Sequence, residues 1–166
     1  MKSTGEVLGV GKTLREALYK GLSAAGYSLK KNGGVLFTIR DTDKPEMIAT
    51  AKKFAELDFT IYATEGTAKT LRENGIEVIT AYKIHQNPND NIVNLLESGV
   101  IDYVISTSSK GRIPTYDNVK IRRKAVELSI PCLTSIDTAN AIVDSLNSGY
   151  SLYTTEIVDI NKIVKR

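Results

Sequence analysis

Short apolar runs alternate with helical patterns along most of the chain. Runs rich in Val, Ile, Leu and Phe are typical of buried strands. Five of them are present, at residues 35–39, 59–63, 77–80, 103–105 and 130–134. Apolar residues at helical spacing predict helices at residues 13–26, from 43 onward, 68–74, 91–98, 118–129 and 138–147. Strands that alternate with helices in this way form a parallel sheet covered on both faces. The pattern therefore predicts an α/β fold with five parallel strands.

The first helix carries recognisable start and stop signals. Thr13 can cap its beginning and Gly26 can end it. Its apolar positions, repeating every fourth residue, are Leu14, Leu18 and Leu22. The polar, glycine-containing segment 28–34 then predicts a hinge before the first strand.

Three further segments give expectations about packing. Asp43 can cap the second helix, with Pro45 in its first turn and Glu46 three residues on. We expect its core face to contain Ile48, Ala51, Phe54 and Ala55. In the helix at 118–129, the positions expected to pack on the sheet are Val119, Ile121, Ala125, Val126 and Leu128. The chain ends in a predicted amphipathic segment with Ile157, Ile160, Ile163 and Val164.

Length and composition limit the classes of protein to consider. A chain of 166 residues predicts one domain with a short appendage. No apolar run approaches the ~18 residues of a membrane-spanning helix, and the start of the chain lacks the apolar stretch of a secretory signal. We therefore expect a cytoplasmic protein without a membrane partner. Cys132 is the only cysteine and His85 the only histidine, which excludes an intrachain disulfide and a cysteine-based zinc site. We expect no metal ion and no cofactor.

Basic residues are concentrated in one part of the chain. The net charge of +3 is too small to indicate nucleic acid by itself, and the eight tyrosines form no stacking stripe. Between Lys110 and Lys124, however, six basic residues face a single acidic residue, Asp117. This cluster indicates either a solvated helix face or a patch that holds phosphate or another subunit.

Hydroxyl groups, a glycine and lysines follow the predicted strands. Because the carboxyl ends of parallel strands share one edge, these side chains should meet there, near the point where the strand order reverses. Helix N-termini at the same edge present free N–H groups and a partial positive charge, which suit a phosphate group. The residues concerned are Thr38, Lys44, Thr64 to Thr67, Lys83 and Ser106 to Gly111.

Each of these residues also has an ordinary structural explanation. Serine and threonine at helix starts are usually caps, whereas Gly66 permits a tight or left-handed backbone. The chain has no Walker motif and no Gly-x-Gly-x-x-Gly after a strand, which disfavours ATP and dinucleotides. We expect Asp90 to cap a helix, His85 to be exposed in a polar loop, and Cys132 to be a small buried side chain in a strand.

Several of these motifs together resemble a known family. They are Thr64-Glu65-Gly66-Thr67, Tyr82-Lys83-Ile84-His85, the run from Val104 to Ser108, and the run from Val119 to Ala125 before Ile130-Pro131. In this order they resemble the C-terminal regulatory domain of the carbamoyl phosphate synthetase large subunit. The resemblance covers residues 33–166, and the opening residues 2–9 look like the end of the preceding synthetase module. It implies a helical segment and hinge at 1–32 and a regulatory domain at 33–166.

The resemblance implies a fold, a ligand and a parent enzyme. The fold is methylglyoxal-synthase-like, and the effector is a nucleotide monophosphate, uridine monophosphate (UMP) with inosine monophosphate (IMP) as a further candidate. The implied phosphate-binding residues are Thr38, Lys44, Thr64, Gly66, Thr67 and Lys83. Ser106, Thr107 and Ser108 take the base or ribose positions, with Ser106 where relatives often have asparagine, and Thr134 takes a position near ornithine. The parent chain is implied to be an ATP-dependent ligase of pyrimidine and arginine biosynthesis, whereas this fragment has no catalytic residues of its own.

Two alternatives remain open on the residues alone. The first is methylglyoxal synthase, an enzyme of the same fold that eliminates phosphate from dihydroxyacetone phosphate. That reaction needs a carboxylate base, and Asp90 is the only plausible candidate. The second is an oligomerisation module with a vestigial pocket. We also expect the chain to self-associate and to pack on the remaining synthetase modules, because the first and last helices carry exposed apolar residues. The resemblance further places Arg122 and Arg123 beside the pocket rim, unless one of them pairs with Asp117.

Overall fold

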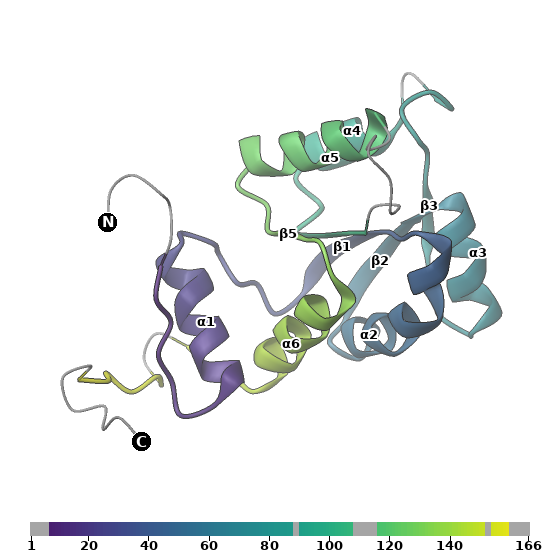
Figure 1. Ribbon diagram of the computed structural model, residues 1–166. Helices are drawn as coiled ribbons and strands as arrows, with labels where there is room; N and C mark the ends of the chain where they lie inside the picture. Colours follow the sequence, from purple (N-terminus) through teal and green to yellow (C-terminus); the bar gives the residue numbers. More distant parts are fainter. Residues whose placement is uncertain (1–6, 88–89, 108–115, 152–153, 160–166) are drawn as a thin grey trace.

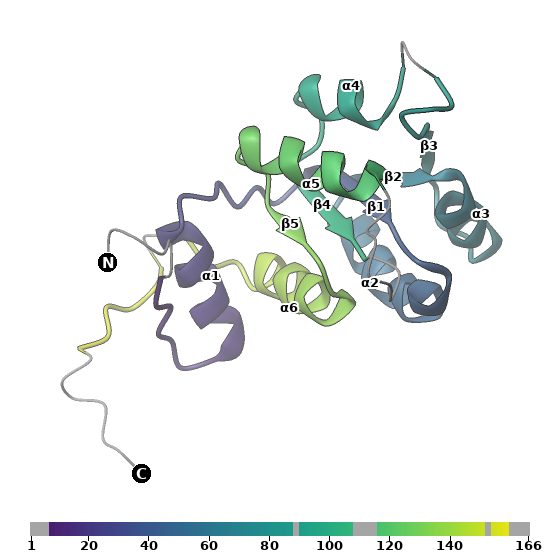
Figure 2. The same cartoon turned by 45° about the horizontal axis from the view of Figure 1, so that its top comes forward.

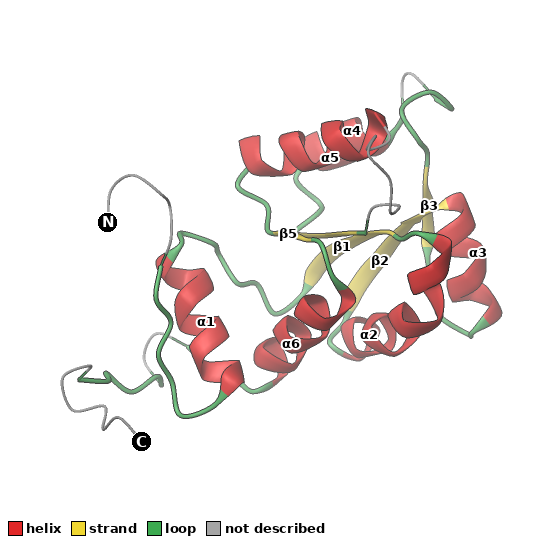
Figure 3. Cartoon of the chain, viewed as in Figure 1, coloured by secondary structure: helices red, strands yellow, loops and turns green. Residues whose placement is uncertain are grey.

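A five-stranded parallel sheet lies between two layers of helices (Figures 1 and 3). The computed structural model describes residues 7–87, 90–107, 116–151 and 154–159. The strands are β1 (Gly33–Thr38), β2 (Phe59–Thr64), β3 (Ile79–Ala81), β4 (Tyr103–Ser106) and β5 (Cys132–Leu133). The helices are α1 (Leu14–Ala24), α2 (Lys44–Glu56), α3 (Glu65–Glu73), α4 (Ile92–Glu97), α5 (Tyr116–Glu127) and α6 (Ile136–Asn147). The predicted fold class and all five strands are confirmed.

Alternating side chains of the strands build two separate cores. Val35 and Phe37 of β1 face the layer that contains α2, α3 and α6, whereas Leu36 faces α4 and α5. Phe54 of α2 centres an aromatic cluster in the larger core, with edge-on contacts to Phe37 and Phe59. Figure 2 shows α4 and α5 together over one face of the sheet, with α2 and α6 beneath the other. Burial on both faces explains why the strands read as continuous apolar runs.

The strand order, β3-β2-β1-β4-β5, reverses direction at β1. The chain moves outward from β1 to β2 and β3, then returns to the other side of β1 with β4. Thr38 and Ser106, the last residues of β1 and β4, are direct register partners at this reversal. Ligands of open α/β sheets bind outside the carboxyl edge at such a point. The fold therefore directs attention to the residues that follow β1, β2 and β4.

Several predicted helix starts and faces differ from the structure. A short 3-10 turn (Asp41–Asp43) precedes α2, and the Asp43 side chain makes no capping bond because its carboxylate pairs with Arg40 at 2.6 Å. Ala55 is exposed and Ile48 half-buried; the buried positions of α2 are Met47, Thr50, Ala51 and Phe54. At α4, the cap is Asn91, through a reciprocal capping box with Asn94, and not Asp90.

The predicted hinge at 28–34 is wrong in its second half, because Gly33 and Gly34 belong to β1. A Cβ atom on Gly34 would lie 2.1 Å from the carbonyl oxygen of Val100, and one on Gly33 would lie 1.9 Å from a carboxylate oxygen of Asp102. These glycines therefore allow close approach to the chain before β4, rather than flexibility.

Helix α5 contacts the sheet through a narrower face than predicted. Ile121 and Ala125 are buried, whereas Val119, Val126 and Leu128 are exposed. Ile121 and Ala125 are four residues apart and form a single stripe on α5, which contacts β4 and β5 and lies alongside α4. At the end of the chain, Ile157 is fully exposed, while the other residues of the predicted amphipathic segment lie outside the described residues.

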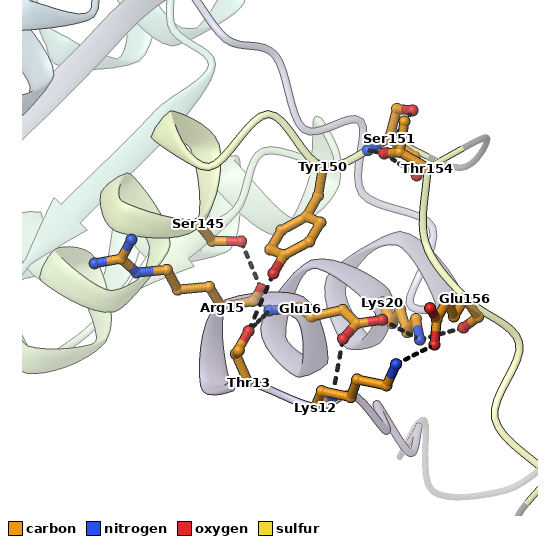
Figure 4. A network of polar contacts seen from close by, with 10 residues as sticks. All are labelled: Lys12, Thr13, Arg15, Glu16, Lys20, Ser145, Tyr150, Ser151, Thr154 and Glu156. Carbon is orange, nitrogen blue, oxygen red and sulfur yellow. Dashed lines mark hydrogen bonds and ion pairs between the residues drawn. The ribbon is translucent and has the colours of Figure 1, made fainter.

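Helix α1 packs against α6 and is held there by polar contacts with the last described segments (Figure 4). Thr13 caps α1 as predicted, and its hydroxyl lies 3.2 Å from that of Tyr150. Ser145 of α6 donates a hydrogen bond to the carbonyl of Arg15 at 2.7 Å. Leu14, expected on the apolar face, is exposed. Segment 1–32 thus lies against the sheet domain in its described part, and its assignment to a preceding module stays a prediction.

Glu16, not a leucine, is the buried residue of α1, at 6% exposed. Its carboxylate accepts hydrogen bonds from the Lys20 ammonium at 2.7 Å and the Lys12 backbone N–H at 2.8 Å. The hydrogen bond from Lys20, followed by that from the Lys12 backbone, holds the pKa of this carboxyl below its ordinary value of 4.5. A carboxyl with a lowered pKa stabilises the fold above its unfolded-state pKa, and this stabilisation is lost as the pH falls through the folded-state pKa.

We predict that Glu16→Gln lowers the free energy of unfolding at pH 7 and that the deficit shrinks as the pH falls below 4.5. Urea denaturation at several pH values, followed by circular dichroism, measures both quantities. The matched control is Glu73→Gln, at an exposed position of α3, which should leave the pH dependence unchanged. A difference in stability between wild type and Glu16→Gln that stays constant as the pH falls would contradict the assignment.

Candidate functional site

A cavity of about 360 Å³ opens at the carboxyl edge of the sheet, on the side of α4 and α5. Four of the predicted site residues line it: Thr38, Thr64, Lys83 and Thr107. The lining residues that the sequence analysis did not assign to a site are Ile39, Arg40, Asp41, His85, Ile92, Asp117, Asn118 and Ile121. The cavity thus gathers the ends of β1, β2 and β4, the β3–α4 connection and the first turns of α5.

Larger hollows exist elsewhere on the described surface. One of about 450 Å³ lies between α4 and α5, and one of about 540 Å³ lies between α1 and α6. Neither lies at the strand ends where the sheet order reverses. The edge cavity combines that position with hydroxyl groups and cationic side chains from several elements, which is typical of a ligand site in this kind of fold.

Helix α3 begins directly after β2, so its N-terminus points to the same edge. Thr64 is the N-cap residue by position, but its side chain makes no capping hydrogen bond to the helix. Lys44, in the first turn of α2, lies close by, since a Cβ atom on Gly66 would be 3.3 Å from the Lys44 ammonium. Gly66 has an ordinary helical backbone, so the left-handed interpretation is wrong and only the close approach remains. The first turn of α3 therefore presents N–H groups beside a cation.

Thr67 is a brace between two of the edge loops. Its hydroxyl accepts hydrogen bonds from the Ile39 N–H at 3.3 Å and from the Thr64 hydroxyl at 3.3 Å, and it donates to the Ile39 carbonyl at 3.4 Å. Thr67 is 1% exposed. It holds the β1–α2 connection against the start of α3, and it does not line the cavity.

Thr107 connects β4 to the β1–α2 connection in a similar way. Its backbone N–H donates to the Thr38 carbonyl at 3.1 Å, and its hydroxyl accepts from the Arg40 N–H at 3.0 Å. Arg40 in turn pairs with Asp43. Burial would raise the pKa of the Asp43 carboxyl, but hydrogen bonds from Arg40, Thr107 and Thr42 outweigh it and lower the pKa. Arg40 therefore lines the cavity with its backbone N–H bonded to Thr107 and its side chain paired with the ionised Asp43.

The cavity lining carries charges of both signs. The Asp41 carboxylate lies 2.7 Å from the Lys44 ammonium, and this hydrogen bond, with a smaller contribution from Lys83, lowers the pKa of Asp41. Asp117 lies 3.4 Å from Nδ1 of His85, whose side chain is exposed as expected. Asp117 therefore pairs with His85, and not with Arg122 or Arg123 as the alternative interpretation of those arginines had it. Arg123 instead pairs with Glu127 at 2.9 Å.

Other predicted site residues lie away from the cavity lining. Ser106 is fully buried at the end of β4, and Thr134 is exposed after β5. Ser108 lies outside the described residues. Cys132 is half-buried rather than buried, and burial raises the pKa of its thiol. Lys120 and Lys124 of α5 are half-buried.

No three His, Cys, Asp or Glu side chains in the described part of the chain lie close enough together to hold a metal ion. Among the helices in the same residues, none is long and apolar enough to cross a bilayer.

Comparison with known proteins defines the family. The family model for the MGS-like domain matches residues 46–134, more than half of the chain, and the chain belongs to this family. A methylglyoxal synthase from Elizabethkingia anophelis NUHP1 has a crystal structure that covers 83% of this chain and 93% of its own, with a TM-score of 0.57 at 20% sequence identity. That similarity concerns the fold alone.

Two curated relatives lead to a more particular protein. The C-terminal section of the carbamoyl phosphate synthase large chain from Methanocaldococcus jannaschii is 47% identical over 148 residues, which cover 89% of this chain and 24% of the relative. The carbamoyl phosphate synthase large chain of Lachnoclostridium phytofermentans is 43% identical over 148 residues, 89% of this chain and 14% of the relative. The chain thus spans less than a quarter of the length of these relatives. The resemblance to this large chain is confirmed.

We predict that Thr67→Val destabilises the protein by about 1–3 kcal/mol, because the buried Ile39 N–H and carbonyl lose their partner. Urea denaturation measures the loss. Thr70→Val is the matched control on the same helix, since the Thr70 hydroxyl only bonds the Gly66 carbonyl one turn back at a less buried position. Equal stability of the two variants would show that the Thr67 hydroxyl is not the brace.

Proposed function

We propose that this chain is the allosteric regulatory domain of a carbamoyl phosphate synthase large chain and binds a nucleoside monophosphate at the carboxyl edge of its sheet. The observation that carries the proposal is the uncapped N-terminus of α3, beside Lys44 and facing a cavity lined by Lys83 and threonine hydroxyls. A phosphate group is the anion that such a set of N–H groups, hydroxyls and ammonium groups binds best. The names of the two relatives support the parent enzyme.

The dimensions of the cavity agree with a ligand larger than phosphate alone. Small-molecule sites span ~300–1,000 Å³, and the cavity measures about 360 Å³. Its wall on the side of α4 and α5 contains the buried apolar side chains of Ile92 and Ile121, which provide a surface for a flat base. UMP is the first candidate, and IMP is the second. Ser106, Thr107 and Ser108 remain the proposed residues for the base or ribose.

The wider role follows from the same proposal. The parent chain would be an ATP-dependent ligase that supplies carbamoyl phosphate to pyrimidine and arginine biosynthesis. This domain would have no catalytic residues, would pack on the remaining synthetase modules and would self-associate. An ornithine contact through Thr134 is part of the proposal, and the exposed position of that residue after β5 leaves it accessible to a neighbouring module.

We predict that Lys83→Ala weakens UMP binding by about tenfold or more, because a charge-assisted contact contributes about 1.5–3 kcal/mol. Lys44→Ala should have a similar effect, and the double variant a larger one. Isothermal titration with UMP, IMP and inorganic phosphate measures the affinities, and UMP should also raise the melting temperature. Lys52→Ala removes an exposed cation elsewhere on α2 and is the matched control. Unchanged UMP affinity in the Lys44/Lys83 double variant would reject the phosphate site.

We further predict that the chain produces no methylglyoxal from dihydroxyacetone phosphate. Asp90, the candidate base, does not line the cavity, and Asp41 and Asp117, which do, are engaged by Lys44 and His85. A colorimetric assay for methylglyoxal tests this directly. Turnover that disappears in Asp90→Asn or Asp117→Asn would favour the enzyme over the regulatory domain.

A further inference from the structure

Asp41 places a carboxylate on one of the lysines that would hold the ligand's phosphate. One of its oxygens lies 2.7 Å from the Lys44 ammonium, and Asp41 itself lines the cavity. Lys83, the second lysine of the site, also lowers the pKa of Asp41 through its charge. A carboxylate and a phosphate are both oxygen anions, and a lysine ammonium binds them through the same N–H donors. Asp41 therefore uses the contact that a bound phosphate would need.

The surroundings of Lys44 explain why it holds a carboxylate. Its ammonium lies at the first turn of α3, because a Cβ atom on Gly66 would be 3.3 Å from it. This helix end carries free N–H groups and a partial positive charge, which repel a cation. The Lys44 side chain is only 17% exposed, so water screens this repulsion in part. A nearby anion relieves the repulsion, and Asp41 supplies one from within the chain.

The two aspartates of the 3-10 turn differ in how firmly they are held. The Asp43 side chain is 15% exposed, pairs with Arg40 at 2.6 Å and accepts a hydrogen bond from the Thr42 hydroxyl at 3.1 Å. The Asp41 side chain is 94% exposed, so it can turn into water without leaving a buried group behind. Asp43 thus belongs to the framework of the site, whereas Asp41 is displaceable.

The strength of the Asp41–Lys44 pair is compatible with displacement by a ligand. An exposed ion pair changes an equilibrium by a factor of at most about five. A phosphate group at the same place carries more charge and more acceptor oxygens, and it also accepts hydrogen bonds from the N–H groups of α3. Phosphate should therefore displace Asp41, with an affinity reduced by the strength of the pair that it replaces.

We propose that Asp41 competes with the ligand's phosphate group for Lys44 and thereby limits the affinity of the site for every phosphate-containing effector. This inference rests on the proposed function, because it concerns the same site. An ion pair between residues three positions apart at a helix start can also serve stability alone. The experiment must therefore separate competition from folding.

The experiment is isothermal titration of the whole chain with UMP and with inorganic phosphate. Asp41→Asn keeps the shape of the side chain but removes its charge, and it should tighten the binding of both ligands by about fivefold. Asp41→Glu keeps the charge and should bind both ligands like wild type. Glu46→Gln is the matched control, because it removes one negative charge from an exposed position in the first turn of α2, outside the cavity lining. Its affinities should equal those of wild type.

A double-mutant cycle tests whether Asp41 acts through Lys44. Loss of a carboxylate from the cavity also removes a general repulsion of anions, and that effect does not need Lys44. In the Lys44→Ala background, Asp41→Asn should therefore tighten phosphate binding by a clearly smaller factor, since the contact for which Asp41 competes is gone. An equal gain in both backgrounds would mean repulsion alone and would overturn the inference.

The pKa of Asp41 provides a second readout, which does not use UMP. The hydrogen bond from Lys44 holds this pKa below its ordinary value of 3.8. In an NMR titration of the side-chain carboxyl carbons, Lys44→Ala should return the pKa toward 3.8. Sulfate keeps two negative charges at these pH values and should raise the Asp41 pKa of wild type as it takes over Lys44. An Asp41 pKa that neither Lys44→Ala nor sulfate changes would also contradict competition.

Failure of the inference and failure of the proposed function give different results. If wild type binds UMP and Asp41→Asn binds it equally or more weakly, Asp41 is not a competitor, and the proposed function stands. If neither wild type nor Asp41→Asn binds UMP or phosphate, the proposed function is overturned and the inference with it. Tighter binding by Asp41→Asn that depends on Lys44 supports both.

Discussion

Strand β1 is paired in parallel on both of its sides, with β2 and with β4, and the positions of the helices and of the cavity follow from this double pairing. Because the chain leaves β1 for β2 on one side and returns to β4 on the other, α2 and α3 cover one face and α4 and α5 cover the other. Both sets of connections open at the carboxyl edge, where Thr38 is the central residue. The position of the cavity is therefore set by the strand topology, and the side chains then determine its chemistry.

The opposite end of β1 is fixed by a different contact. The Asp102 carboxylate accepts a hydrogen bond from the Gly34 N–H at 3.0 Å and pairs with Lys30 at 2.6 Å. These bonds hold the start of β1 against the start of β4, which sets the register that brings Thr38 beside Ser106 at the other end. A one-residue slip would move each side chain of β1 to the opposite core. The geometry of the site thus depends on glycines and an aspartate at the far edge of the sheet.

The strands were predictable because burial on both faces leaves continuous apolar runs. Gly26 marks the end of α1 with a positive φ, as expected, and Gly75 and Gly99 follow α3 and α4 with positive φ in the same way. Helix starts were less predictable, because capping depends on where a side chain is drawn by tertiary partners. Asp43 looks like a cap in sequence, yet Arg40 engages its carboxylate. The narrow buried stripe of α5 likewise depends on the neighbouring α4, which no local pattern reveals.

The residues of the candidate site can likewise be divided into those that the sequence could predict and those that it could not. Residues at the carboxyl ends of strands, such as Thr38, Thr64 and Thr107, could be placed at the edge from sequence because topology alone puts them there. Arg40 and Asp117 could not, since the first carries no motif and the second was considered only as an alternative partner of Arg122 or Arg123. Thr67 lies at the predicted edge of the sheet, but its hydroxyl is fully engaged by hydrogen bonds with Ile39 and Thr64. Its role is therefore to hold the loops together. Only the structure separates hydroxyls that face a cavity from those that join loops.

The attachment of α1 has a mechanical consequence. The segments before α1 and after α6 both lie along this helix, and Lys12 and Glu156 join them at 2.6 Å on the side of the molecule away from α3 (Figures 1 and 4). Gly9 approaches the α1 backbone so closely at Ala17 and Gly21 that a Cβ atom could not fit. Tension applied between the two segments would first shear the Lys12–Glu156 pair and then peel α1 from α6. The sheet and its carboxyl edge would carry little of this force until α1 had detached. The contacts of α1 therefore protect the ligand site from tension between the two segments.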